Sequence, residues 1–319
     1  MRKKGRKLTN HLTYVLLTVN MMIWGLNTVA IKVLVEHFPP LTMQSMRIFF
    51  AGCLVSSILY LRREWKPMAL RDWKWIFGAM IFGVVGHHSF LATGLSLTTA
   101  TNGAIILALV PLTTTLLSFL LLKDRLTWLR SVGIALGFTG VALVVLNGGE
   151  SLQQSATGDL YMFGAMFSQA LSFIFIKKAT DTLDAKQVTA VMFSIGSFCI
   201  FLLSLLLHPA EAGALADGSP GVWAILLSSA VIATGLGHMF YNSAIPRLGT
   251  GQTAIFINLT PFFALVGAVI FLGESMVWTQ AAGFLFIVAG VFLGTGALDH
   301  KRPSIESGAW KSSRKGTDI

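Results

Sequence analysis

The chain has 319 residues, of which 54% are hydrophobic and 12% are charged, and its mean hydropathy is +0.70. So few charges cannot cover the surface of a water-soluble domain, so the composition excludes a soluble fold and predicts an all-α integral membrane protein. The formal net charge is +10, but the Lys and Arg residues stand in short runs between apolar segments. That spacing is typical of anchors beside a lipid bilayer, and we expect no nucleic-acid partner.

Ten apolar segments have about the 20 residues that a helix needs to cross a bilayer. They are 12–35, 41–61, 73–95, 98–121, 127–147, 158–178, 186–207, 221–244, 250–272 and 277–297. Residues 1–11 and 298–319 remain as polar tails at the two ends. We therefore predict ten transmembrane helices joined by short loops.

The first segment carries Trp24 and Asn27 near its middle. Trp24 is about 12 residues into the segment, so at about 1.5 Å per residue it lies near the midplane rather than in the interfacial aromatic belt. Two interpretations fit. Either Trp24 and Asn27 line a central substrate cavity, or Asn27 forms an interhelical hydrogen bond and Gly25 permits close helix packing.

Two cationic residues lie inside the first two segments. Lys32 stands four residues before Glu36 and is expected to form an ion pair at the outer end of its helix, with its head group reaching the interface. Arg47 lies about six residues, or roughly 9 Å, below the outer end of the second segment. Its guanidinium either binds an anionic or carboxylate-bearing substrate or snorkels outward along its stem, and snorkelling is the simpler interpretation.

The third and eighth segments carry histidines, at His87, His88 and His238. No Asp or Glu stands near the middle of a segment, so proton coupling would depend on histidine, whose ordinary pKa near 6.5 suits that role. The alternative is a neutral histidine bonded to a neighbouring carbonyl or hydroxyl. Further cavity candidates are Gln169, Ser172, Asn242, Gln252 and Asn258, each of which can equally join two helices.

Pro111 and Pro261 fall inside the fourth and ninth segments. A proline inside a helix removes a backbone hydrogen bond and promotes a kink. The two prolines either let half-helices move as gates or form fixed bends that pack well.

A repeat is visible when the sequence is shifted by 150 residues. The aligned residues are Gly, Pro, His and Trp, whose placement apolar composition alone does not dictate. The pairs include Trp73 with Trp223, His88 with His238, Pro111 with Pro261, Trp128 with Trp278, Gly133 with Gly283 and Gly140 with Gly290. A shift of 146 aligns the upstream part, with Lys32 on Lys178, Met46 on Met192 and Cys53 on Cys199. We expect two five-helix repeats, 12–147 and 158–297.

Because five is odd, the second repeat enters the membrane from the opposite side. The loop after the fourth segment, KDR, is basic, whereas its counterpart GES after the ninth is acidic. The basic loops predict both termini in the cytoplasm and the chain in the plasma membrane. A cleaved signal peptide is the alternative for the first segment, but its length and polar residues argue against it. Two inverted repeats are typical of secondary transporters.

Several motifs resemble the EamA-type family of the drug/metabolite transporter superfamily. They are WGLN at Trp24 to Asn27, RIFFAG from Arg47, ALVPLTTTLLSFLLLKDRLT and NLTPFFALVGAVIFLGESM. The chain departs from the family pattern at Lys123-Asp124, where Gly-Glu is usual, and at SQALS in the sixth segment. The resemblance implies a ten-helix carrier that exports amino acids, nucleobases or related metabolites.

Three functions are weighed. A secondary exporter of small polar metabolites is favoured by the inverted repeats and the polar midplane residues. An uptake carrier or exchanger, or a drug efflux protein, has the same architecture. A membrane enzyme or sensor is disfavoured, because the sequence has no metal-ligand spacing, catalytic motif or phosphate-binding loop. We expect no cofactor, metal or catalytic residue, and a small-molecule substrate and lipid as partners; whether a homodimer forms is left open.

Overall fold

The computed structural model describes residues 2–122, 127–146, 152–211, 213–248, 256–257 and 259–294. The described part of the chain is helical and contains no strand, which confirms the predicted all-α class. The site candidates Gln252 and Asn258 lie outside these ranges, as does the expected tail 298–319.

The first repeat is built from consecutive helical elements, some of which join into one span. They are α1 (Arg2–His37), α2 (Pro40–Leu61), α3 (Leu70–Met80), the π-helix η1 (Ile81–Gly86), α4 (His87–Leu97), α5 (Ala100–Leu107), α6 (Val110–Leu122) and α7 (Trp128–Leu146), which covers the expected fifth segment. Because α3, η1 and α4 are continuous, they form one span, as α5 and α6 form another. Helix α1 begins at Arg2, so residues 2–11 of the expected N-terminal tail 1–11 are helical.

The second repeat follows the same order. It contains α8 (Leu152–Ala179), α9 (Ala185–Leu207), the short 3-10 helices η2 (Pro209–Glu211) and η3 (Ala214–Asp217), α10 (Pro220–Ser228), the π-helix η4 (Ser229–Leu236), α11 (Gly237–Leu248), α13 (Thr260–Leu272) and α14 (Trp278–Gly294). When η1 is shifted by 150 residues it becomes 231–236, which falls inside η4. The two repeats therefore share a π-helical segment at the same place in their third spans.

Seven spans within the described residues are long and apolar enough to cross a membrane, and α13 and α14 are shorter apolar helices. The chain is thus a multi-pass membrane protein. The count of ten stays a prediction, because much of the expected ninth span, including 249–255, lies outside the described residues.

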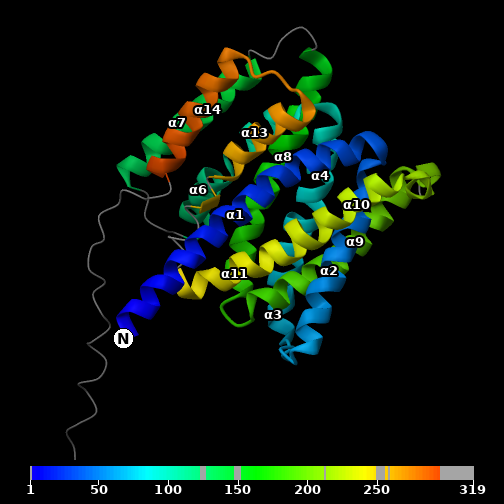
Figure 1. Cartoon of the computed structure of the whole chain (residues 1–319), viewed down its shortest axis with the longest axis vertical. Helices are drawn as coiled ribbons and strands as arrows, with labels where there is room; N and C mark the ends of the chain where they lie inside the picture. The colour runs from blue at the N-terminus through cyan, green and yellow to red at the C-terminus, as the bar shows by residue number, and fades with distance from the viewer. Residues whose placement is uncertain are drawn as a thin grey trace, which may run out of the picture.

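The helix packing follows the internal repeat. Helix α2 packs along α9, and α7 along α14, so each of these pairs joins equivalent spans of the two repeats. Figure 1 shows α7 and α14 side by side at one edge of the bundle, with α2 and α9 away from them. The contact of α4 with α8 has its counterpart in the contact of α1 with η4 and α11. Exchanging the two repeats therefore maps one set of contacts onto the other.

The loop contacts show that the repeats are inverted. Gln187, just after the sixth span, exchanges two hydrogen bonds with the backbone of Lys66, just after the second, at 2.7 and 3.1 Å. At the opposite face, Phe38 after the first span packs on Trp223, which follows the seventh, with ring centroids 5.9 Å apart. Corresponding loops of the two repeats thus lie on opposite faces, as an in-plane twofold axis requires.

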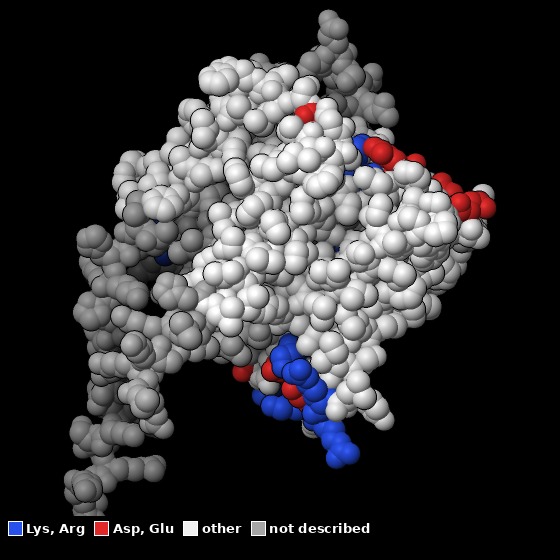
Figure 2. All heavy atoms as spheres, viewed as in Figure 1, with Lys and Arg blue, Asp and Glu red and all other residues white. Residues whose placement is uncertain are grey.

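The charges separate along the same direction. Figure 2 shows Lys and Arg gathered at the end of the molecule where α2 ends and α3 begins, while Asp and Glu dominate a patch near α10, across a broad uncharged belt. At the basic end Lys186 donates to Glu64 at 2.8 Å, and this hydrogen bond lowers the pKa of the Glu64 carboxyl below its usual value. This polarity agrees with a basic cytoplasmic face.

Glycines let α7 and α14 approach closely. A Cβ added at Gly290 would lie 2.6 Å from the backbone oxygen of Gly133 and 2.6 Å from the nitrogen of Gly137. Such distances are shorter than van der Waals contact, so only glycine fits. In the structure these glycines pack against each other within one chain.

Gly290→Ala is expected to destabilise the protein by about 1 to 3 kcal/mol, because the added methyl group forces two helix backbones apart. Thermal unfolding of the purified protein in detergent measures this change. Gly213→Ala is the matched control, since a Cβ there meets nothing within 4 Å. Equal stability of the two variants would contradict the described α7–α14 packing.

Candidate functional site

Arg47 lies at the centre of a polar cluster between the two repeats. Its side chain is 1% exposed. Its Nε donates to Gln44 Oε1 at 2.7 Å, and its Nη1 donates to Thr234 Oγ1 at 2.8 Å and to Ser229 Oγ at 3.3 Å. Its Nη2 donates to His88 Nδ1 at 3.1 Å. We call these residues, together with Asn27, the Arg47 cluster.

The snorkelling interpretation of Arg47 is therefore wrong. Arg47 lies on α2 where that helix packs against η4 and α4, so polar partners are available sideways across the helix interfaces. Internal hydrogen bonds replace water there, and the side chain need not extend to the membrane surface. Distance from the helix end, which suggested snorkelling, carries no information about these lateral partners.

Every hydrogen-bond partner of the Arg47 guanidinium is uncharged. Among the described residues, no Asp or Glu forms an ion pair with it. A guanidinium can only donate, so His88 Nδ1 accepts and the His88 ring is neutral with its hydrogen on Nε2. The cluster thus holds one positive charge and no negative charge.

The π-helix η4 explains how two hydroxyls reach one nitrogen. Ser229 and Thr234 are five residues apart, and in an α-helix residues five apart face directions about 140° apart. The wider turn of a π-helix brings such residues onto one face. Accordingly, Thr234 Oγ1 also donates to the carbonyl of Ser229 at 3.0 Å. The π-helix η4 thereby presents both hydroxyls to Arg47.

Helix α1 joins the cluster through Asn27 and Trp24. Ser229 Oγ donates a hydrogen bond to Asn27 Oδ1. Trp24 Nε1 donates to the carbonyl of Ala233 at 2.8 Å. The centroid of its ring lies 4.8 Å from that of the His238 ring and 5.4 Å from that of the Tyr241 ring. The interhelical hydrogen bond expected in the packing interpretation is thus present for Asn27. Lining of a cavity by Trp24 and Asn27 stays a prediction.

Close helix packing at Gly25 is present as well. A Cβ there would lie 2.7 Å from the backbone nitrogen of Ala264 and 2.7 Å from the carbonyl oxygen of Thr260. Helix α1 therefore lies against the beginning of α13, which belongs to the other repeat.

The three histidines have different partners. His87 Nδ1 lies 2.9 Å from the carbonyl of Ala165, and His238 Nδ1 lies 2.8 Å from that of Thr234. Because a carbonyl only accepts, both rings carry a hydrogen on Nδ1. Whether these histidines are neutral or take part in proton coupling stays a prediction. His88 is the one of the three that contacts Arg47 directly.

The two repeats differ at the cluster. The shift of 146 residues places Arg47 on Phe193, and the shift of 150 places His88 on His238. Where Arg47 donates to His88, Phe193 packs edge-on against His238 with centroids 5.6 Å apart. One half of the pseudosymmetric centre is thus cationic and the other aromatic.

Other sequence-predicted residues have hydrogen-bond partners other than Arg47. Gln169 Nε2 donates to the Ser172 hydroxyl at 3.4 Å, and Ser172, which is 0% exposed, donates to the Gln169 carbonyl at 2.8 Å. Lys32 forms the expected ion pair with Glu36 at 3.6 Å and also donates to the Leu95 carbonyl at 2.9 Å. The Asn242 side chain lies outside the described part of the structure.

The prolines stand at helix starts rather than inside continuous helices. Helix α5 ends at Leu107, and α6 begins at Val110 with Pro111 in its first turn. Pro261 likewise follows Thr260 at the start of α13. A first-turn proline loses no helical hydrogen bond, so the expected kink is instead a break in the fourth span just before Pro111. Gating at these positions stays a prediction.

At the end of the bundle opposite the basic end, Glu274 caps a helix of the other repeat. Its two carboxylate oxygens accept from the backbone nitrogens of Ala100 at 2.7 Å and Thr101 at 2.8 Å. Thr99 Oγ1 accepts from the nitrogen of Asn102 at 3.0 Å. The first three N–H groups of α5 are thereby satisfied, and the negative charge lies at the positive end of the helix dipole.

A buried carboxylate extends this contact. Asp159 of α8 is 3% exposed and accepts from Thr98 Oγ1 at 2.6 Å and from Asn102 Nδ2. Asn102 Oδ1 in turn accepts from Gln280 Nε2 at 2.7 Å. Polar groups of both repeats therefore join the two repeats at this end of the bundle.

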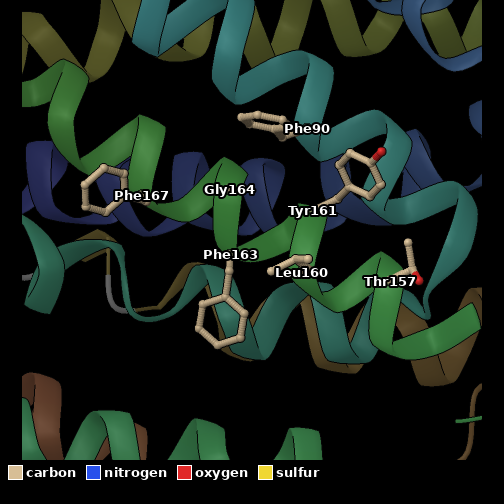
Figure 3. Close-up of a pocket in the computed structure, with 7 residues that line it drawn as sticks. All are labelled: Phe90, Thr157, Leu160, Tyr161, Phe163, Gly164 and Phe167. Carbon is tan, nitrogen blue, oxygen red and sulfur yellow. The ribbon is translucent and has the colours of Figure 1, made fainter. Parts of the chain in front are cut away.

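A hollow of about 600 Å³ lies elsewhere, between α4 and α8. Figure 3 shows the residues that line it, which are Phe90, Thr157, Leu160, Tyr161, Phe163, Gly164 and Phe167. Leu160 is 70% exposed and Phe167 is 49% exposed. The hollow therefore opens on the outer, apolar surface of the bundle and contains no residue of the Arg47 cluster.

Sequence reasoning missed Gln44, Ser229 and Thr234. A hydroxyl inside an apolar helix ordinarily bonds its own backbone, so Ser229 and Thr234 carried no signal. Gln44 stands three residues before Arg47, and this spacing on one helix face was the available hint. Among the described residues, no group of three His, Cys, Asp or Glu could hold a metal ion.

Comparison with known proteins gives consistent results. The model of the EamA-like transporter family matches residues 11–146 and 156–295. The uncharacterized transporter YyaM of Bacillus subtilis is 27% identical over 84% of this chain and 88% of its own length. A probable amino-acid metabolite efflux pump of Salmonella typhimurium is 27% identical over 90% of this chain and 96% of its own. One solved crystal structure, at 15% identity, has a TM-score of 0.63 and covers 91% of this chain and 99% of that one.

Glu274→Gln is expected to lower stability by about 0.5 to 2 kcal/mol, because an amide offers one acceptor oxygen to the two N–H groups of α5 and no charge to its dipole. Thermal unfolding measures the loss. Glu211→Gln is the control, since the Glu211 contact in the structure is to His208 at 3.6 Å. A Glu274 variant no less stable than the Glu211 variant would show that the cap is unimportant.

Proposed function

The chain belongs to the EamA-like transporter family, and we propose that it is a secondary exporter of small polar metabolites. Family membership makes it a membrane transporter rather than an enzyme, with a small-molecule substrate and with lipid around it. The observation that carries the proposal is the Arg47 cluster, because buried polar and ionisable groups in a membrane are expensive and are found where a substrate passes. The cluster lies where the two inverted repeats meet, which is where carriers of this kind bind their substrates.

Alternating access is the mechanism that we propose. The bonds from Arg47 to Ser229 and Thr234 join the first repeat to the second at the centre, as those of Glu274 do at the end opposite the basic end. Separation of the repeats on one face and then on the other would expose the cluster to each side in turn. The break before Pro111 and the start of α13 at Pro261 are proposed hinges for these movements.

Two observations support the proposed substrate class and the proposed direction of transport. The midplane Trp24, Asn27, His88 and His238 suit an uncharged or zwitterionic molecule with a planar or apolar part, such as an amino acid or a nucleobase. The similar Salmonella protein is described as a probable amino-acid metabolite efflux pump, which favours export. We place the chain in the plasma membrane with both termini in the cytoplasm, and its transport units at 12–147 and 158–297, on the loop charges and the repeat.

Mass spectrometry of medium and cell extract tests export. Cells expressing the wild type are expected to accumulate one class of metabolite outside, and Trp24→Ala is expected to lower that export about tenfold by removing a ring from the site. Trp128→Ala is the matched control, because Trp128 is 80% exposed on the bundle surface. All proteins are compared at equal amounts in the membrane.

Three other outcomes would revise the proposal. Accumulation inside the cells would indicate an uptake carrier. Equal export by the Trp24 and Trp128 variants would remove Trp24 from the site while leaving transport in place. No change in any metabolite would contradict the exporter function.

A further inference from the structure

We propose that the transported molecule carries a carboxylate, which binds Arg47 by displacing the Ser229 and Thr234 hydroxyls from Nη1. This inference rests on the proposed transport function and names the substrate class of the same site. Four observations support it. They are the charge of the cluster, the unpartnered Gln44 donor beside Arg47, the location of the displaced hydroxyls in the second repeat, and the ion pair that already engages Lys32.

The positive charge of the Arg47 cluster favours binding of an anion. The Arg47 side chain is 1% exposed, and its partners Gln44, Ser229, Thr234 and His88 are all neutral. Desolvating an ion costs several kcal/mol, which neutral hydrogen bonds offset in part and an opposite charge offsets best. Within the described residues no carboxylate pairs with Arg47. A substrate that brings its own carboxylate would supply the missing charge.

Gln44 supplies a second donor. Its Nε2 is buried and has no hydrogen-bond partner among the residues that the structure describes, while its Oε1 accepts from Arg47 Nε. The amide cannot be reversed, because its nitrogen would then face the guanidinium, which has no acceptor. An unsatisfied buried donor destabilises the folded state, because the N–H group has lost its hydrogen bond to water. A carboxylate has two oxygens, so it can accept from Arg47 and from Gln44 together.

A carboxylate is a stronger acceptor for Arg47 Nη1 than the Ser229 and Thr234 hydroxyls, so it can displace them. Both a hydroxyl and a carboxylate accept a hydrogen bond from Nη1, but only the carboxylate adds the attraction of an opposite charge, which is strong in a buried site. Ser229 and Thr234 belong to the second repeat, whereas Arg47 belongs to the first. Binding of the anion would therefore release one repeat from the other, and a neutral molecule would not compete in this way.

A single charge favours a carboxylate over a phosphate. The nearest alternative cation along α1, Lys32, is already paired with Glu36 and bonded to the Leu95 carbonyl. His88 accepts from Arg47 and is neutral in this arrangement. One available positive charge matches a monoanion or the carboxylate of a zwitterion, whereas a dianionic phosphate would keep an unpaired charge.

The test compares acids with their amides on the purified full-length protein. The probes are the twenty L-amino acids and their amides, benzoate and benzamide, adenine, uracil and inorganic phosphate, and the readout is the shift in melting temperature with probe concentration. At least one carboxylate is expected to raise the melting temperature, and its amide is expected to bind about tenfold more weakly or worse, as loss of a charged hydrogen bond implies.

Two variants separate binding from folding. Arg47→Gln is expected to abolish the preference for the acid over the amide. Thr234→Val keeps the side-chain shape but removes a competing hydroxyl, so it is expected to tighten carboxylate binding several-fold, which a merely structural role of Thr234 would not do. The wild-type acid and amide comparison and the Thr234 variant decide the proposal even if Arg47→Gln fails to fold.

The proposal is overturned if no carboxylate raises the melting temperature, if an amide, nucleobase or phosphate does so as strongly as any carboxylate, or if Thr234→Val weakens carboxylate binding. Its failure is distinguishable from failure of the transport function. Export of an uncharged metabolite by the wild type would leave the carrier standing and refute the carboxylate, whereas absence of any export would contradict the carrier itself.

Discussion

One positive charge buried between two repeats organises the centre of this protein. Water cannot solvate Arg47 at 1% exposure, so the surrounding helices must supply its hydrogen bonds. Helix α2 supplies Gln44, α4 supplies His88, and η4 supplies Ser229 and Thr234. Because these partners come from both repeats, the solvation of one side chain holds the two halves in register.

The inverted repeat gives the scaffold its symmetry, and the proposed substrate site lies where the two repeats differ. Both third spans contain a π-helix at equivalent positions, and the α2–α9 and α7–α14 pairs join equivalent spans. Yet Arg47 is replaced by Phe193 in the second repeat, so only one half contributes the cation. A symmetric frame with an asymmetric centre suits a carrier, whose two conformations exchange the halves around one substrate.

The repeat and the membrane class were predictable from the sequence, because Gly, Pro, His and Trp recur at fixed spacing among apolar runs. Trp24, Asn27, Arg47, His88 and His238 were also predicted, and the structure brings them together. The partners of Arg47 were not predicted from the sequence. The hydroxyls of η4 reach Arg47 only because of a π-helical turn, and amino-acid composition does not reveal such a turn. For the same reason distance along α2 suggested snorkelling, although the lateral contacts decide where the guanidinium points.

The central claim is that the Arg47 cluster is a site reached from both faces of the membrane. Asn27→Cys, in a chain whose Cys53 and Cys199 are replaced by Ser, tests it with a thiol reagent that cannot cross the bilayer. Labelling from each face in turn, with the introduced thiol protected by the transported metabolite, is the expected result. A thiol that stays unlabelled from both faces under all conditions would show that the cluster is a sealed core, which contradicts the account.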